Sequence, residues 1–320
     1  GALAQLCALL KYVKPFYNPL NEGDHTEALS QLLAMLALNY AKRVGVESGA
    51  HRVKRAWTPP EGPLTEEHTR TLVEALMPLA LDSMRSKDTS SAFLASQTVK
   101  DLASVAPEMV VPQVSELIIP TLENVMRPHE VQSAIMLTST LSPYILRAPD
   151  GLDLLGQVLR LTVAGVDLND AHKTMYTFRM LMCIMSQVPL TDPKDMPPGV
   201  AKPEMLYGLQ EWVVEVIDRI LSVLEHVPSI KKGFYMGQVL SGTIGRFFDV
   251  FLQQMSPTLH AAALERISRK VSTTLYPPAQ KYVGAMVDAL VHSAPPAALK
   301  ELIPDICGKI VGGGGGLNPA

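Results

Sequence analysis

Hydrophobic residues recur along most of this chain at the spacing of α-helices, and the pattern is clearest between Phe93 and Val125. Apolar residues follow one another there at intervals of three or four: Ala95, Val99, Leu102 and Ala106, and then Val111, Val114, Ile118, Leu122 and Val125. Such intervals place the apolar side chains on one face of a helix. The stretch therefore predicts a helix, a corner at Ala106 and Pro107, and a second helix that runs back along the first.

Prolines indicate where these helices begin and bend. Pro107 and Pro112 suit the start of the second helix, because an N–H group in the first turn has no partner inside the helix. Pro120 lies further along and leaves the carbonyl of Glu116 without its N–H donor, which predicts a kink. For the same reason, we expect the next helix to break at Pro143.

The same periodicity predicts about a dozen helices and no β-strand, because strict alternation of apolar and polar residues is absent. The expected helices span residues 1–13, 24–44, 65–84, 93–106, 107–125, 130–146, 150–164, 171–188, 204–226, 230–255, 259–276, 279–292 and 297–311. Asp24, Thr65 and Asp170 are expected to cap three of them. One hairpin of this size cannot bury its own apolar face, and the pairs recur at roughly 40 residues, as in HEAT and armadillo repeats. We therefore predict an all-α fold, an α-solenoid of irregular HEAT-like helical hairpins.

The expected domain organisation is a single continuous array over residues 1–311. Irregular loops interrupt it near 45–63 and 189–203, and the second loop is expected to be exposed because it holds five prolines and little apolar content. Residues 312–320 begin with five glycines and are expected to form a flexible tail. The chain starts inside a predicted helix without a methionine, so we interpret it as a piece of a longer protein.

Composition narrows the functional classes. The chain has 320 residues, of which 47% are hydrophobic and 18% charged, and its net charge of −3 does not favour nucleic-acid binding. It lacks the run of about 18 apolar residues that a membrane span needs. The cysteines Cys7, Cys183 and Cys307 are odd in number and far apart, which favours a reducing compartment and no disulfide framework.

Catalytic and metal-binding patterns are absent from the sequence. The histidines form no HExxH pattern, the glycines of the tail lack the Lys-Ser/Thr of a phosphate loop, and no GxSxG elbow occurs. Cys183 follows His172 by eleven residues, which is about 16 Å along a helix and too far for a nucleophile and its base. We therefore expect no catalytic residue, no metal and no cofactor site.

One basic segment is a candidate binding site. Arg52, Lys54 and Arg55 lie on the first irregular loop, and Lys42 and Arg43 lie at the end of the helix before it. The favoured interpretation is a solvated loop whose charges complement the helix dipole. The alternative hypothesis is that Arg52, Lys54 and Arg55 contact an anion such as a polyphosphate or an acidic peptide.

Three stretches resemble one known family. They are residues Leu10 to Leu36, Arg55 to Leu81 and Asp153 to Ile184, and their most specific parts read YVKPFYNPLNEGDH and GVDLNDAHKTMYTF. These stretches resemble the central region of the large single-chain HEAT-repeat proteasome activator, which caps the proteasome core particle without ATP. The resemblance is good over about the first 190 residues and looser beyond them.

The resemblance implies a hollow dome of HEAT-like hairpins on the core particle. It implies ATP- and ubiquitin-independent degradation of peptides and of acetylated proteins such as histones, a link to DNA repair, and a location in the nucleus and cytoplasm. Family members also bind inositol phosphates, although no motif here assigns that ligand to particular residues. The family opens the gate with a carboxyl-terminal tail that contains tyrosine. This chain ends in Leu317-Asn318-Pro319-Ala320, so we expect that it does not open a gate by itself.

The sequence leaves two other functional classes to compare. A different HEAT-repeat scaffold, such as a nuclear-transport receptor or a phosphatase-type adaptor, should show regular repeats with a recurrent Asp/Arg ladder, which this sequence lacks. An enzyme would need polar residues at workable spacing, and none is found. The leading hypothesis is a non-catalytic segment of a proteasome activator, with the core particle and its protein substrates as partners and neither nucleic acid nor membrane as a direct partner.

Overall fold

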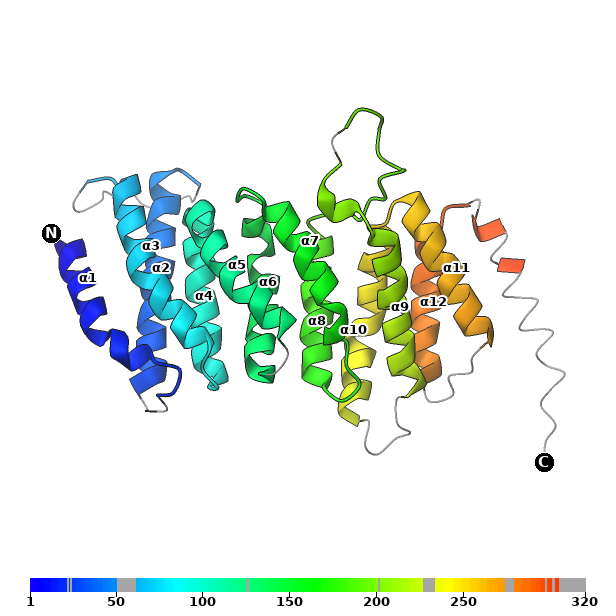
Figure 1. Cartoon of the computed structure of the whole chain (residues 1–320), viewed down its shortest axis with the longest axis horizontal. Helices are drawn as coiled ribbons and strands as arrows, with labels where there is room; N and C mark the ends of the chain where they lie inside the picture. Colours follow the sequence, from blue (N-terminus) through cyan, green and yellow to red (C-terminus); the bar gives the residue numbers. More distant parts are fainter. Residues whose placement is uncertain are drawn as a thin grey trace. The chain divides into compact units, whose positions relative to one another are not determined.

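The computed structural model describes residues 1–21, 23, 25–50, 62–124, 127–200, 202–226, 234–273, 279–296, 298–300 and 303–304. Within these ranges the regular elements are helices, and an isolated β-bridge joins Leu190 and Met255. The α-helices are α1 (Ala2–Val13), α2 (His25–Glu47), α3 (Glu66–Met84), α4 (Thr89–Val105), α5 (Pro107–Glu123), α6 (Pro128–Ile145), α7 (Gly151–Leu161), α8 (Ala171–Met185), α9 (Leu209–Glu225), α10 (Phe234–Gln253), α11 (Pro257–Thr273) and α12 (Gln280–Ser293). Three 3₁₀ turns accompany them: η1 (Lys14–Tyr17), η2 (Val163–Gly165) and η3 (Glu204–Leu206). The predicted all-α fold is confirmed (Figure 1).

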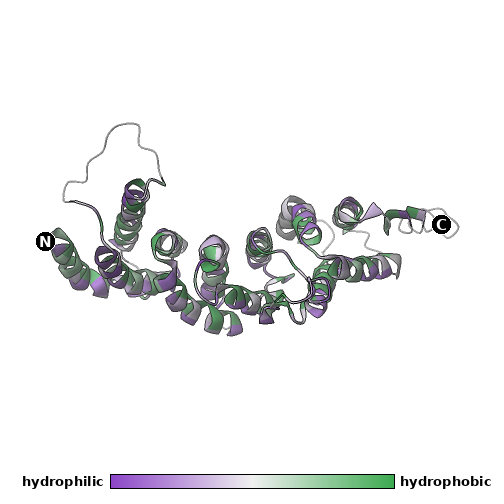
Figure 2. Cartoon of the chain, turned by 90° about the horizontal axis from the view of Figure 1, so that it is seen from above, coloured by the Kyte–Doolittle hydropathy of each residue, from purple (hydrophilic) through white to green (hydrophobic). Residues whose placement is uncertain are grey.

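The chain forms two compact units, Gly1–Leu161 and Thr162–Ala320. In the first unit, α2, α4 and α6 pack side by side in one layer, and α1, α3, α5 and α7 form the other. In the second unit, α8, α10 and α12 form one layer, and α9 packs on α11 in the other. Figure 2 shows these two rows of helices within each unit. This alternation is the stacking of HEAT-like hairpins. The single continuous array over 1–311 stays a prediction, because it concerns how the units join.

The core of the first unit is centred on α4 and α5, as their periodicity predicts. Ala95, Val99, Leu102 and Ala106 are each at most 1% exposed, and Val111, Val114, Ile118 and Leu122 are also buried. Val125 lies outside the described residues. Because α4 carries small side chains on its buried face, its neighbours can approach closely, and α2, α3, α5 and α6 all pack against it. Both faces of hairpin α4–α5 are therefore used in stacking.

The core of the second unit is aromatic. Phe247, Phe248 and Phe251 of α10 lie together, with ring centroids 5.1–6.2 Å apart. Phe178 of α8 lies 4.7 Å from Phe247, and Trp212 of α9 lies 5.9 Å from Phe251. Such large buried rings dominate the hydrophobic energy of a core, and their tilted contacts add to it. This cluster fixes α8, α9 and α10 against one another.

The predicted break at Pro143 is wrong. Helix α6 continues through this proline to Ile145. The hydroxyl of Ser142 donates a hydrogen bond of 3.3 Å to the carbonyl of Ser139, the acceptor that Pro143 cannot serve. Pro143 is tolerated near the end of α6 because the neighbouring Ser142 side chain supplies the missing donor.

Helix α5 begins at Pro107 as expected, but the expectation that Pro112 also lies at its start is wrong, because Pro112 is inside the helix. Helix α5 continues through Pro120 to Glu123, and the kink expected at Pro120 stays a prediction.

Several predicted helix boundaries also differ from the structure. The helix expected over 204–226 is divided, because Gly208 adopts a left-handed conformation with φ of 77° between η3 and α9. The helix expected over 150–164 ends at Leu161 and is followed by η2. The cap predicted at Asp24 and most of the helix predicted over 297–311 lie outside the described residues. The caps at Thr65 and Asp170 are confirmed by their bonds to the N–H groups of His68 and Lys173.

Candidate functional site

The predicted anion site cannot be placed, because Arg52, Lys54 and Arg55 lie outside the described residues. Its neighbour Arg43 has a structural role. The Arg43 Nε donates to Glu47 at 2.8 Å, and one of its terminal nitrogens donates to the carbonyl of Gly62 at 2.8 Å.

The other carboxylate oxygen of Glu47 accepts the N–H of Leu64 at 2.6 Å. The hydrogen bond from Arg43 and that from the Leu64 backbone lower the pKa of Glu47. Arg43 and Glu47 together clamp the end of α2 to the segment that leads into α3. This use of Arg43 favours the structural interpretation of that residue and leaves the loop arginines as a hypothesis.

The first specific segment of the family resemblance forms the joint between α1 and α2. Tyr17 is 1% exposed, and its hydroxyl donates to the carbonyl of Leu29 at 3.0 Å. Burial raises the pKa of Tyr17 to about 12. The side-chain amide of Asn21 donates to the carbonyls of Pro15 and Phe16 at 3.1 and 3.2 Å. These contacts fix the turn through η1, so the residues act by holding helices at a set angle.

The second specific segment forms the joint between η2 and α8. The Lys173 ammonium lies 2.8 Å from the Asp167 carboxylate. Burial raises the pKa of Asp167, but the hydrogen bonds from Lys173 and Asn169 outweigh it, so the pKa is lowered overall. The hydroxyl of Thr174 donates to the Asp167 carbonyl at 2.8 Å and accepts the Asp167 N–H at 2.9 Å. The segment is therefore a closed polar turn.

Helix α9 also contacts this turn. The Nε of Arg219 donates to the carbonyl of Val166 at 2.7 Å. Gly165 is required beside it, since a Cβ there would lie only 2.3 Å from the Thr177 hydroxyl. The signature GVDLNDAHKTMYTF thus connects η2, α8 and α9. It resembles a structural joint more than a binding pocket.

A third joint was missed by sequence reasoning. The loop after α8 was expected to be exposed, yet Leu190 is 1% and Asp192 6% exposed, so that expectation is wrong for its first part. Leu190 exchanges two backbone hydrogen bonds of 2.8 Å with Gln254 and Ser256, in the turn between α10 and α11. The pair of aspartates in this loop is the only feature of the sequence that points to this joint. Their hydrogen-bond partners lie more than 60 residues away, so the sequence does not show which residues they contact.

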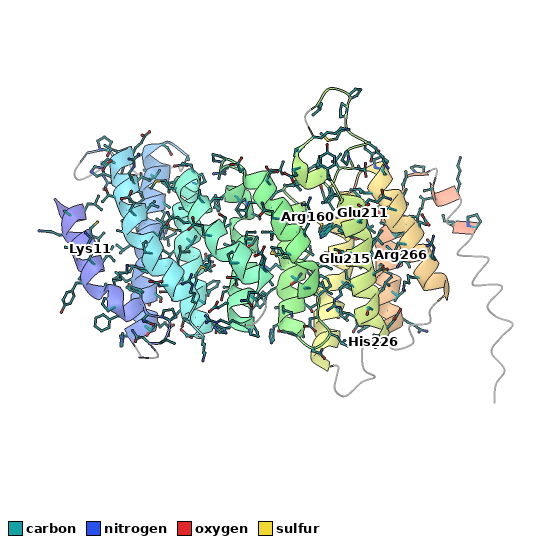
Figure 3. All side chains as sticks on the ribbon, in the orientation of Figure 1. Lys11, Arg160, Glu211, Glu215, His226 and Arg266 are labelled. Carbon is teal, nitrogen blue, oxygen red and sulfur yellow. The ribbon has the colours of Figure 1, made fainter. Side chains whose placement is uncertain are left out.

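Asp195 completes this third joint. Its carboxylate accepts the N–H and the hydroxyl of Thr258 at 2.9 and 2.8 Å, so it caps α11 from a distant loop. Burial raises the pKa of Asp195, but hydrogen bonds from Ser256 and Thr258 outweigh it and lower the pKa overall. A further tie links α11 to α9. Arg266, which Figure 3 labels on α11, makes two hydrogen bonds of 2.6 and 2.5 Å with Asp218 of α9.

No reactive centre accompanies these joints in the described part of the chain. No group of three or more His, Cys, Asp or Glu residues there could hold a metal ion. Within the described residues, neither Cys7 nor Cys183 is part of a disulfide, and Cys307 lies outside these residues. None of the helices searched, all within the described ranges, is both long and apolar enough to cross a membrane.

Comparison with known proteins gives a consistent family. A family model described as "Proteasome activator complex subunit 4, mid HEAT repeats region" matches residues 6–205 and 201–312. Proteasome activator complex subunit 4A of Danio rerio is 27% identical over 340 residues, which cover 97% of this chain. The Arabidopsis thaliana and Homo sapiens relatives, proteasome activator subunit 4 and proteasome activator complex subunit 4, are 25% and 23% identical, and each alignment covers 95% of this chain. The chain spans only 18% of the length of each of these relatives.

The match extends over all three joints. The family model includes the turn at η1, the turn at η2 and the clamp between Asp195 and α11, and its name agrees with the stacked hairpins of the structure. A solved structure of an engineered protein covers 84% of the chain and 99% of its own at 14% identity, with a TM-score of 0.37 that is too low to carry an argument. The family match shows that this chain belongs to the mid HEAT repeat region of the proteasome activator complex subunit 4 family.

Proposed function

We propose that this chain is a wall segment of a proteasome activator that caps the core particle. The single observation that carries the proposal is the family match, which extends over nearly the whole chain. The activator would promote ATP- and ubiquitin-independent degradation of peptides and of acetylated proteins such as histones, in the nucleus and cytoplasm. A contribution to DNA repair is part of the same proposal. Neither a nuclear-transport receptor nor a phosphatase-type adaptor is favoured by any feature of the structure.

The work of such a segment is mechanical. Stacked hairpins hold a fixed wall, and an activator shifts a gate only by contacting its open and closed states differently. The polar joints support this role, because each ties helices of one unit together through side chains that are already hydrogen-bonded. Nothing in such a mechanism requires a catalytic group of the chain's own.

The test uses the full-length parent protein with isolated proteasome core particles. We expect the parent to co-purify with core particles and to stimulate hydrolysis of fluorogenic peptides without ATP. The chain of residues 1–320 alone should not stimulate hydrolysis, because it spans only 18% of the length of the relatives. Failure of the parent to bind core particles would contradict the proposal, and so would stimulation by the isolated chain.

The anion hypothesis at Arg52, Lys54 and Arg55 is tested separately. A triple alanine variant of the parent should lose affinity for inositol hexakisphosphate in a calorimetric titration. The matched control replaces Lys11, Lys14 and Lys87, which are exposed lysines elsewhere in the first unit. Unchanged affinity in the triple variant removes the hypothesis.

A further inference from the structure

A groove of about 440 Å³ lies between α5 and α7 in the first unit. Its walls come from one stripe on each helix, together with the corner that precedes α7. The lining residues are Val111, Pro112, Ser115, Glu116, Ile119, Pro120, Pro149, Asp150, Asp153, Leu154 and Gln157. The side chains of Val111 and Leu154 are buried, and Ile119 is half-buried. The groove therefore has an apolar floor.

The rim of this groove is acidic. Glu116, Asp150 and Asp153 are exposed, and no lysine, arginine or histidine among the described residues lines the groove. Pro120 has no N–H group to offer the carbonyl of Glu116 four residues earlier, which leaves another acceptor on the same wall. The groove offers negative charge and hydrogen-bond acceptors. Its side-chain donors are the Gln157 amide and the Ser115 hydroxyl, which already donates to the carbonyl of Pro112.

The backbone holds the groove in a fixed shape. Asp150 adopts a left-handed conformation with φ of 58°, and its carbonyl accepts the N–H of Leu154 at 3.0 Å. Gly151 is required beside it, because a Cβ there would lie 1.8 Å from the carbonyl oxygen of Ile145. Prolines at 112, 120 and 149 stiffen both sides. A preformed site loses less entropy when a ligand binds.

The arrangement selects the chemical class of ligand. The rim carboxylates do not converge, since no group of three acidic residues in the described ranges could hold a metal ion. Carboxylates that are spread along the rim of an apolar groove suit a polypeptide ligand in which basic and aliphatic side chains alternate. From Val111 to Ile119 the helix rises about 12 Å, roughly the length of four extended residues.

We propose that this groove binds an extended polypeptide segment in which lysine or arginine alternates with aliphatic residues. The basic side chains contact Glu116, Asp150 and Asp153, and the aliphatic side chains contact Ile119 and Leu154. That this segment belongs to an unfolded substrate protein rests on the proposed function. The preference for a basic segment rests on the groove alone.

The test measures peptide binding to the whole chain by fluorescence anisotropy, without core particles. Three fluorescein-labelled hexapeptides alternate leucine with arginine, with glutamine or with glutamate. The arginine peptide should bind about tenfold more tightly than the glutamine peptide, as expected for a few exposed ion pairs. The difference should shrink as salt is added. Equal binding of the arginine and glutamate peptides overturns the proposal.

Matched variants locate the binding. The variant Glu116→Gln, Asp150→Asn and Asp153→Asn should weaken arginine-peptide binding about tenfold, and asparagine tolerates the left-handed position 150. The control replaces Glu67, Glu74 and Glu123, which are exposed on α3 and α5, by glutamine. Equal loss in both triple variants overturns the proposal.

Single substitutions keep the proposal falsifiable if the triple variant fails to fold. Ile119→Gln should weaken the arginine and glutamine peptides alike, and Asp153→Asn should weaken only the arginine peptide. Circular dichroism checks the fold of each variant. Because core particles are absent from this measurement, its failure leaves the proposed function standing, and failure of core-particle binding leaves the peptide result standing.

Discussion

At the scale of single residues, the buried histidine of the second unit has a measurable consequence. His260 is 6% exposed, and its Nε2 lies 2.9 Å from the hydroxyl of Ser293. Burial lowers the pKa of His260, because the charged imidazole loses its hydration. The neutral form is therefore favoured in the folded state.

We expect stability to fall as the solution is acidified below about pH 6.5, the unfolded pKa of histidine. Below this pH the unfolded chain binds a proton at His260 and the folded chain does not. The free energy of unfolding therefore decreases as the pH falls towards the lowered pKa of the folded state. The midpoints of urea unfolding at pH 7.5, 6.5 and 5.5 measure this loss of stability. The variant His260→Gln should show a shallower slope over this range, and an identical slope would contradict the assignment.

At the scale of elements, Asp195 is a helix cap supplied from outside its helix. Replacing it by alanine should destabilise the second unit by about 1 kcal/mol, as for other lost N-caps. Since the pKa of Asp195 is lowered, its contribution is present above about pH 4 and is lost as pH falls through the folded value. Chemical denaturation at pH 7 checks the size, with Lys194→Ala on the same loop as the control.

The tie between α9 and α11 should be modest but measurable. Arg266 and Asp218 are 26% and 34% exposed, and their double hydrogen bond fixes the geometry. A double-mutant cycle with Arg266→Met and Asp218→Asn should give a coupling of roughly 0.5–1 kcal/mol. The pair Arg269 and Glu265, which is 61% and 69% exposed, should give less. A larger value for the exposed pair would show that the bidentate geometry adds nothing.

Periodicity predicted the elements well because helices are local. The buried faces of α4 and α5 were read correctly from intervals of three and four residues. The break predicted at Pro143 was wrong because the Ser142 hydroxyl replaces the missing N–H donor. This replacement depends on the rotamer of Ser142, which the sequence does not show. The joint at Asp195 could not be predicted, since its partner Thr258 is distant in sequence and the two meet only in the folded chain. Of the candidate site, only the flanking residues of α2 can be assessed: Arg43 proves structural, and Lys42 is exposed.

At the scale of the whole chain, exposed hydrophobic side chains are unevenly distributed. Among the described residues, six of the ten large hydrophobic side chains that are exposed belong to α1, η1, α2 and the turn between them: Leu9, Tyr12, Phe16, Leu20, Leu32 and Met35. Such a concentration marks an interaction surface or an aggregation hazard. We refer to these residues as the N-terminal apolar surface.

We expect the isolated chain to self-associate through the N-terminal apolar surface. Light scattering after size exclusion should show species larger than a monomer. The variant Tyr12→Ser, Leu20→Ser and Met35→Gln, at positions that are 80%, 85% and 49% exposed, should shift the chain towards monomer. Serine at Phe93 and Val200, which are 49% and 48% exposed, should not shift the chain towards monomer. A monodisperse monomer of the unaltered chain would contradict the expectation.

The loop after α8 is held at both of its ends, and this suggests a practical use. Leu190 and Asp195 attach its first part to the turn before α11, while Met205 and Leu206 are buried at its close. Between them, residues 197–200 are exposed, with Gly199 in a left-handed conformation at φ of 83° (Figure 1). A short epitope or fluorophore-accepting tag inserted after Pro198 should leave the helices undisturbed. It would give the full-length protein an internal handle that leaves both chain ends untouched.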